Sequence, residues 1–196
     1  MKKIIMSILA GGIISLAATT ESTNWSVDNS HSSILFAVQH MTVAKTMGWF
    51  TEYDVKMTSN GIEDYSNAQV EITIQGKSVI TGNEQRDNHL KGKDFFHTDS
   101  FPTITFKSTS FTKVKGNNYK IKGNLTMRGV TKEETFDAVY NGMKKDPWGN
   151  NKAGWAIRGK VDRTKYGVNW NAPLEGGGNM LEKNVEIMCE FELVKK

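Results

Sequence analysis

Nearly every segment of this chain alternates apolar and polar residues with a period of two. The clearest run places Tyr119, Ile121, Gly123, Leu125 and Met127 on one side, with lysine, asparagine and threonine between them. Such alternation is typical of a β-strand that buries one face and exposes the other. The sequence therefore predicts an all-β protein.

Eight runs of this kind follow a short lead-in at residues 25–28, at residues 34–40, 47–57, 68–75, 102–111, 119–127, 134–141, 155–162 and 185–193. Turn-forming pairs such as Asn60-Gly61 and Asn141-Gly142 lie between them. One segment, Asn83–Lys91, has the features of a short helix, with Asn83 as its N-cap and Gly92 after its end. Because no linker or repeat interrupts the series, we expect a single domain.

Eight antiparallel strands with one apolar face can stack as two sheets or close into a barrel. Closure removes the exposed strand edges, which favours a single eight-stranded barrel. A barrel of this size has an interior that is either filled by side chains or just wide enough for one small ligand. The choice between these two interiors depends on the residues that point inward.

The inward positions include several small residues, namely Gly123, Gly159, Ala138, Ser108 and Ala68. Because protein interiors do not tolerate large voids, these positions predict a space that an apolar ligand completes. The alternative is a solid core in which large side chains cover the glycines: Trp49, Trp155, Phe106 and Phe136.

The first residues have the pattern of an export signal. Lys2 and Lys3 precede an apolar stretch at residues 4–16, and small residues follow at 15–17. We therefore expect a signal peptide at residues 1–17 and a mature domain at residues 18–196 without a transmembrane segment. Removal of two lysines would change the net charge from +4 to +2. The expected location is the periplasm or the medium outside the cell.

Charge and cysteine content exclude some partners and cross-links. Lysines and acidic residues are interspersed, without the basic stripe that follows a phosphate backbone, so no nucleic acid partner is expected. The one cysteine, Cys189, cannot form an internal disulfide. It continues an apolar register, and we expect it to be buried.

Three polar residues are candidates for contact with a ligand head group. His40 ends the apolar register of residues 34–40, where a cavity would meet water. Arg86 and His89 are three residues apart and share one face of the predicted helix. Two interpretations stay open for that helix. It closes one barrel end by packing of Leu90 and the phenylalanines after it, or it presents Arg86 or His89 to a ligand at the barrel mouth.

Catalytic patterns are weak. Asp87, His89 and His97 contain metal-ligand types, but their spacing is not that of a known site, so no metal site is predicted. The chain has no nucleophile elbow, phosphate loop or dinucleotide fingerprint. We therefore expect no catalytic residues and no enzyme. A metal-assisted envelope enzyme using these three residues is kept as an alternative.

Several segments match, in order, a known pattern from about Trp25 to the C-terminus: residues 25–36, 38–41, 81–90, 94–96, 101–106, 123–126, 128–131 and 162–163. The block Arg86-Asp-Asn-His89-Leu, followed by Asp94-Phe-Phe and Phe101-Pro, is the most specific part. By these segments the chain resembles the YceI-like, polyisoprenoid-binding family.

The resemblance implies a lipocalin-like barrel with an elongated cavity that holds isoprenoid chains, including quinone tails, in exported bacterial proteins. It implies binding rather than catalysis, and no cofactor beyond a bound isoprenoid lipid or quinone. The hypothesis is therefore an exported carrier or storage protein. We expect His40, Arg86 and His89 near the head group and an apolar lining of Phe36, Val38, Trp49, Tyr53, Val70, Ile72, Ile74, Phe106, Ile121, Leu125, Trp155 and Ile157.

Two further expectations concern partners. A solid barrel without ligand would instead be an interaction module that docks an envelope partner by its loops. Two copies of the chain could also pair through a mouth surrounded by Trp148, Trp170 and Met180.

Overall fold

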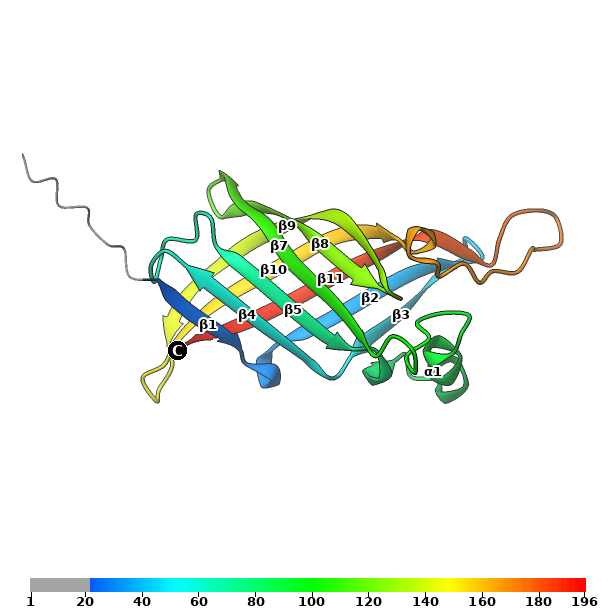
Figure 1. Ribbon diagram of the computed structural model, residues 1–196, viewed down its shortest axis with the longest axis horizontal. Coiled ribbons are helices and arrows are strands. Elements are labelled where there is room, and N and C mark those ends of the chain that lie inside the picture. The colour runs from blue at the N-terminus through cyan, green and yellow to red at the C-terminus, as the bar shows by residue number, and fades with distance from the viewer. Residues whose placement is uncertain (1–21) are drawn as a thin grey trace, which may run out of the picture.

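The computed structural model describes residues 22–196, so the predicted signal peptide lies outside the described residues. One antiparallel sheet closes on itself (Figure 1). Its strands are β1 Thr23–Val27, β2 Ser33–His40, β3 Ala44–Phe50, β4 Tyr53–Ser59, β5 Gln69–Gln75, β6 Val79–Ile80, β7 Thr103–Lys115, β8 Asn118–Met127, β9 Val130–Lys145, β10 Asn151–Asp162 and β11 Leu181–Lys195. The helices are α1 Glu84–Lys91 and the 3-10 turns η1 Asn29–His31, η2 Gly76–Ser78 and η3 Arg163–Tyr166.

The eleven strand segments form eight barrel strands. β1 and β2 lie end to end across η1 and pair with the two halves of β11. β4 and β3 continue one another in the same way and pair with β1 and β2. β5 and β6 form the next strand, interrupted by η2. The predicted eight-stranded, lipocalin-like barrel with one short helix is confirmed.

Helix α1 begins and ends where the sequence predicts. The Asn83 side chain accepts a hydrogen bond from the Arg86 backbone N–H at 2.9 Å, and the helix ends at Gly92. In the part of the chain that the structure describes, no helix is long and apolar enough to cross a bilayer.

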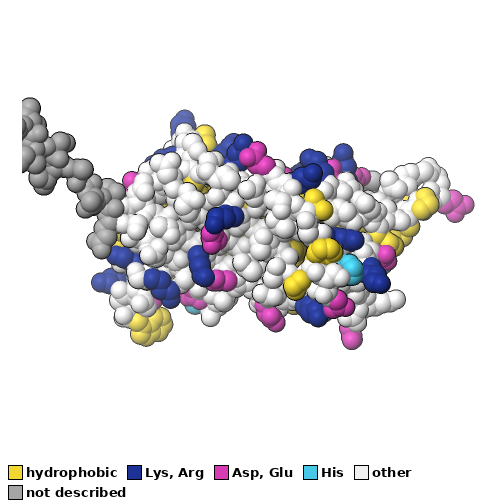
Figure 2. All heavy atoms as spheres, viewed as in Figure 1, with side chains coloured by type: hydrophobic (Ala, Val, Ile, Leu, Met, Phe, Trp, Pro, Cys, Tyr) yellow, Lys and Arg dark blue, Asp and Glu magenta, His cyan; other side chains and the backbone are white. Residues whose placement is uncertain are grey.

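The outer face of the barrel carries charges of both signs (Figure 2). Several form ion pairs between neighbouring strands: Lys107 Nζ is 2.7 Å from Glu71 Oε1 directly opposite, and Lys122 Nζ is 2.8 Å from Glu133 Oε1 on the diagonal. Cross-strand pairs of this kind support the strand register, although each adds little stability because water surrounds it.

The two ends of the barrel differ (Figure 1). At one end, called the mouth here, lie α1, the β2–β3 turn and the loop at residues 167–180. At the other end, called the closed end, lie the start of β1, the loops at residues 60–68 and 146–150, and the C-terminus. This polarity decides which inward residues can contact a ligand.

An aromatic plug fills the closed end; its members are Trp25, Tyr65, Phe111, Tyr119, Tyr140 and Trp155. Trp155 lies at the centre, with ring centroids 4.9 Å from Tyr65, 5.1 Å from Tyr140 and 5.2 Å from Phe111. Tyr65 comes from the loop at residues 60–68 and is 1 % exposed. The solid-core alternative therefore holds for this end.

Two of the small inward residues, Gly123 and Gly159, do not leave the space that was predicted at their positions. A Cβ atom on Gly123 would lie 2.6 Å from Cζ of Phe106, and one on Gly159 would lie 2.5 Å from Cδ1 of Phe136. The phenylalanine rings thus lie over the glycines, as the solid-core alternative supposes for these two positions. Glycine is needed there because the aromatic ring takes the place of a side chain.

Candidate functional site: the barrel cavity

A cavity of about 660 Å³ lies between the aromatic plug and the mouth. Its walls are almost entirely aliphatic and aromatic, and its volume is in the range of cavities that bind small molecules. The barrel thus combines a solid end with a hollow end. The hollow arises although aromatic rings cover the inward glycines.

Twelve of the fifteen predicted site residues line this cavity: Phe36, Val38, His40, Val70, Ile72, Ile74, Arg86, His89, Phe106, Ile121, Leu125 and Ile157. They come from β2, β5, α1, β7, β8 and β10. The alternating pattern of each strand points these residues to the inside, and closure of the sheet brings them together. Their contact with a ligand stays a prediction.

Trp49 does not line the cavity. Its side chain is 40 % exposed, because the inward positions of β3 are occupied by Gly48 and Phe50. The predicted run at residues 47–57 in fact contains two strand segments, separated by residues 51–52. A break of this kind moves the pattern from one face of the sheet to the other.

Tyr53 and Trp155 also lie away from the cavity. Tyr53 is partly buried near Phe191, with 6.5 Å between ring centroids, and borders a separate depression with Glu52 and Asp54. Trp155 points inward as predicted, but at the level of the aromatic plug, where it is 1 % exposed.

Sequence reasoning missed two groups of lining residues. Val185, Ile187 and Cys189 of β11 line the cavity and belong to an alternating run that already predicted their direction. Phe96 and Val168 also line it, but they come from irregular segments where no period marks the inner face. Burial raises the pKa of the Cys189 thiol to about 12, so this thiol stays protonated at neutral pH.

At the mouth, α1 both packs inward and presents polar groups, so its two interpretations are compatible. Leu90 lines the cavity wall together with Arg86 and His89. Arg86 donates from Nε to Thr81 Oγ1 at 2.8 Å and from Nη2 to the Thr81 carbonyl at 3.0 Å. His89 Nε2 lies 2.9 Å from Asp94 Oδ2.

The loop at residues 167–180 supplies the opposite part of the mouth. Trp170 lines the cavity, and its ring centroid is 5.2 Å from that of His89. Met180 also lines it, whereas Trp148 is 83 % exposed on the loop at the closed end. The predicted rim of Trp148, Trp170 and Met180 is therefore wrong for Trp148. Pairing of two copies at the mouth stays a prediction.

Arg163 in η3 was part of the matching pattern, but its position in the cavity wall was not foreseen. Only 5 % of this residue is exposed. Its guanidinium donates to the backbone carbonyls of Val168 at 2.7 Å, Trp170 at 2.9 Å and Glu182 at 3.0 Å. Burial lowers its pKa below the ordinary value. Arg163 therefore connects the mouth loop to the start of β11.

The residues of the metal-enzyme alternative do not gather at one point. Asp87 accepts a hydrogen bond from Thr81, His89 pairs with Asp94, and His97 Nε2 lies 3.0 Å from Ser100 Oγ. Across residues 22–196, the one group of three potential metal ligands lies elsewhere.

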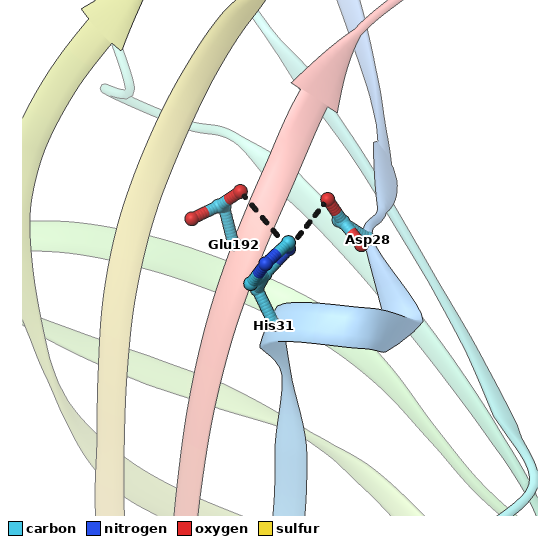
Figure 3. Close-up of side chains that lie close together, drawn as sticks. All are labelled: Asp28, His31 and Glu192. Atoms are coloured by element: carbon cyan, nitrogen blue, oxygen red, sulfur yellow. Dashed lines mark hydrogen bonds and ion pairs between the residues drawn. The ribbon is translucent and has the colours of Figure 1, made fainter. Parts of the chain in front are cut away.

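That group is Asp28, His31 and Glu192 (Figure 3). His31 Nδ1 lies 3.0 Å from Asp28 Oδ2 and 3.7 Å from Glu192 Oε1. Lys152 Nζ lies 2.7 Å from the same Asp28 oxygen and 2.6 Å from the same Glu192 oxygen. A lysine ammonium thus already bridges the two carboxylates and balances one of their two negative charges. The cluster connects η1, β10 and β11 and is an ion-pair network rather than a metal centre.

This network makes stability depend on pH. Hydrogen bonds from Lys152, and then from His31, hold the pKa of Asp28 below its ordinary 3.8, and the Lys152 pKa is raised above 10.5. The Asp28 contribution is therefore present above about pH 4 and disappears as the pH falls further. We expect Lys152→Met to lower the Tm by a few degrees at pH 7.

The same comparison at acidic pH provides the check. Below about pH 4 the Tm difference between wild type and Lys152→Met should shrink, because Asp28 is then protonated in the unfolded chain and must lose that proton to form the ion pair that only wild type has. Lys120→Met is the matched control, since Lys120 pairs with Asp137 while both side chains are more than half exposed. A Lys152→Met difference that stays constant from pH 7 to pH 3 would contradict this account.

Comparison with known proteins places the fold in a family. A family model described as a YceI-like domain matches residues 25–193. UPF0312 proteins of Staphylococcus aureus strains N315 and USA300 are each 42 % identical over 174 residues, covering 87 % of this chain and 98 % of the relative.

Solved structures agree on the architecture. The Campylobacter jejuni YCEI protein is 28 % identical, with a TM-score of 0.70 over 80 % of this chain and 89 % of that chain. Burkholderia cenocepacia BcnA is 18 % identical, with a TM-score of 0.71 over 85 % and 98 %. A polyisoprenoid binding domain from Saccharophagus degradans is 12 % identical, with a TM-score of 0.64 over 88 % and 98 %. From its matched profile, its relatives and its barrel, this chain belongs to the YceI-like domain family.

Proposed function

We propose that this protein is an exported carrier or storage protein that holds an isoprenoid lipid, an isoprenoid quinone or a similar long-chain amphiphile in its barrel cavity. The observation that carries the proposal is the apolar cavity of about 660 Å³ beside a mouth with polar groups. Such a cavity matches a ligand with an apolar tail and one polar end.

Energetics support a tail of this kind. Burial of apolar surface contributes about 25 cal/mol per Å², so about 300 Å² of tail would contribute about 7.5 kcal/mol before ordering costs. The polyisoprenoid binding domain of Saccharophagus degradans has the same fold, which adds support for the ligand class. The N-terminal pattern of residues 1–17 supports export.

Native mass spectrometry on the gently purified protein tests the proposal. We expect a mass increase equal to one lipid, and extraction with solvent should release a long-chain amphiphile. We also expect the stripped protein to take up an added isoprenoid quinone. A protein that carries no lipid after purification and then refuses isoprenoid quinone, isoprenoid alcohol and fatty acid would overturn the carrier proposal.

A further inference from the structure

The groups that line the cavity are strongly biased in charge. Four side chains able to carry positive charge line it, namely His40, Arg86, His89 and Arg163. No aspartate or glutamate is among the lining residues of the described chain. Binding of an apolar tail alone does not require positively charged groups in the cavity lining. Their position at the mouth therefore points to the ligand's head group.

Arg163 is the buried part of the bias, with 5 % of the residue exposed, and the nearby Asp162 carboxylate favours its charge without forming a direct ion pair with it. Its donors are directed to the backbone carbonyls of Val168, Trp170, Leu181 and Glu182. Within residues 22–196, no carboxylate oxygen lies within 4 Å of its guanidinium nitrogens. The nearby Asp162 accepts instead from the Thr164 backbone N–H and hydroxyl. Carbonyl oxygens thus satisfy its donors, but burial still disfavours the charged guanidinium, and a bound anion nearby would favour it.

Arg86 is the part of the bias that can contact a head group directly. Hydrogen bonds from Nε and Nη2 to Thr81 fix its guanidinium, and among the described residues Nη1 has no hydrogen-bond partner. Thr81 in turn donates to the buried Asp87 at 2.5 Å. The guanidinium is therefore held in place at the cavity wall with one nitrogen available.

The two arginines belong to the same end of the cavity. Arg163 binds the carbonyl of Trp170, and the Trp170 ring contacts His89, which lies three residues after Arg86 on α1. The carboxylates of this end, which include Glu84, Asp87, Asp94 and Glu175, are not among the cavity-lining residues. Basic side chains thus line the inner side of the mouth, whereas its carboxylates lie outside the cavity lining.

We propose that the mouth selects amphiphiles with an anionic head group, a carboxylate or a phosphate ester, over neutral and cationic ones. The apolar tail enters the cavity, Arg86 donates to the head group and Arg163 supplies the field of a buried positive charge. This inference rests on the proposed function for the tail, but it concerns only the head group. It separates isoprenyl phosphates and long-chain carboxylates from quinones.

The test uses four ligands that share one tail: farnesyl phosphate, farnesoic acid, farnesol and farnesylamine. Affinities are measured by calorimetry with the lipid-free protein at pH 8. We expect both anions to bind about tenfold more tightly than farnesol, a difference of about 1.4 kcal/mol, because a hydrogen bond from a guanidinium to an anionic oxygen is stronger than one to a hydroxyl. Farnesylamine should bind weakest. The phosphate and carboxylate arms show which anion is preferred.

Variants assign the effect to the mouth. Arg86→Gln should weaken farnesyl phosphate about tenfold and leave farnesol within about twofold, while Arg86→Lys should restore part of the anion preference. Lys91→Gln is the matched control, because this substitution removes one positive charge from the same helix, and Lys91 does not line the cavity. It should leave all four affinities within about twofold.

The outcomes are distinguishable. Equal binding of farnesyl phosphate, farnesoic acid and farnesol by wild type would overturn the head-group selection and leave the carrier proposal in place. An anion preference that survives unchanged in Arg86→Gln would overturn the role of Arg86. Binding of none of the four ligands, together with refusal of isoprenoid quinone, would overturn the carrier proposal itself.

Discussion

Replacing Trp155 with alanine should lower the free energy of unfolding by about 3–5 kcal/mol, the usual cost of removing a large aromatic side chain from a packed core. Trp155 is 1 % exposed and its ring contacts Tyr65, Phe111, Tyr119 and Tyr140 of the aromatic plug. These rings come from several strands and one loop, so they cannot collapse together to fill the space. Chemical unfolding monitored by circular dichroism measures the loss.

Trp155→Phe is the matched control. Among residues 22–196, the indole N–H of Trp155 has no hydrogen-bond partner although it is buried. Phenylalanine keeps an aromatic ring and removes this unsatisfied donor, which offsets part of the lost contact area. We expect Trp155→Phe to cost less than half as much as Trp155→Ala. If both variants were equally destabilised, the plug would not owe its stability to ring packing.

The barrel could be predicted because alternation directly reports which face of a strand is buried. This worked for β5, where Val70, Ile72 and Ile74 all line the cavity, and for β2, where Phe36 and Val38 do. Closure followed from the number of strands and the need to cover their edges. These inferences need only local sequence and the chemistry of the backbone.

Trp49 shows where alternation fails. Met47 and Trp49 are apolar but face outward, 48 % and 40 % exposed, whereas Val55 and Met57 with the same parity face inward. The two residues between β3 and β4 shift the phase without a glycine or proline to mark the break. Exposed apolar residues thus extend the apparent register of buried ones across a break in the strand.

Depth along the barrel is also absent from the alternating pattern. Trp155 and Ile157 share a face and lie two residues apart, yet one is in the aromatic plug and the other lines the cavity. The boundary is set by Tyr65, which enters from a loop. Arg163 is placed in the same way, by carbonyls of loop residues. Such contacts between distant segments have no periodic signal.

Filling the cavity from its wall should weaken ligand binding close to a hundredfold without unfolding the protein. Ile72 lines the cavity from β5 and is only partly buried, because its side chain borders the hollow. In Ile72→Trp the larger ring has room, so the overpacking cost of about 1–3 kcal/mol in a solid core should not arise. If the ring displaces about 100 Å² of ligand contact, affinity falls by about 2.5 kcal/mol, close to a hundredfold.

Equilibrium dialysis with radiolabelled farnesol measures the affinity, and thermal unfolding measures the stability of the same preparations. Val139→Trp is the matched control, because it adds the same ring to the outer face of β9, where Val139 is 36 % exposed. This control should bind farnesol as wild type does. If Ile72→Trp is unstable, Ile187→Phe places a smaller ring in the cavity from β11. A stable cavity-filling variant with wild-type affinity would mean that the tail binds outside the barrel.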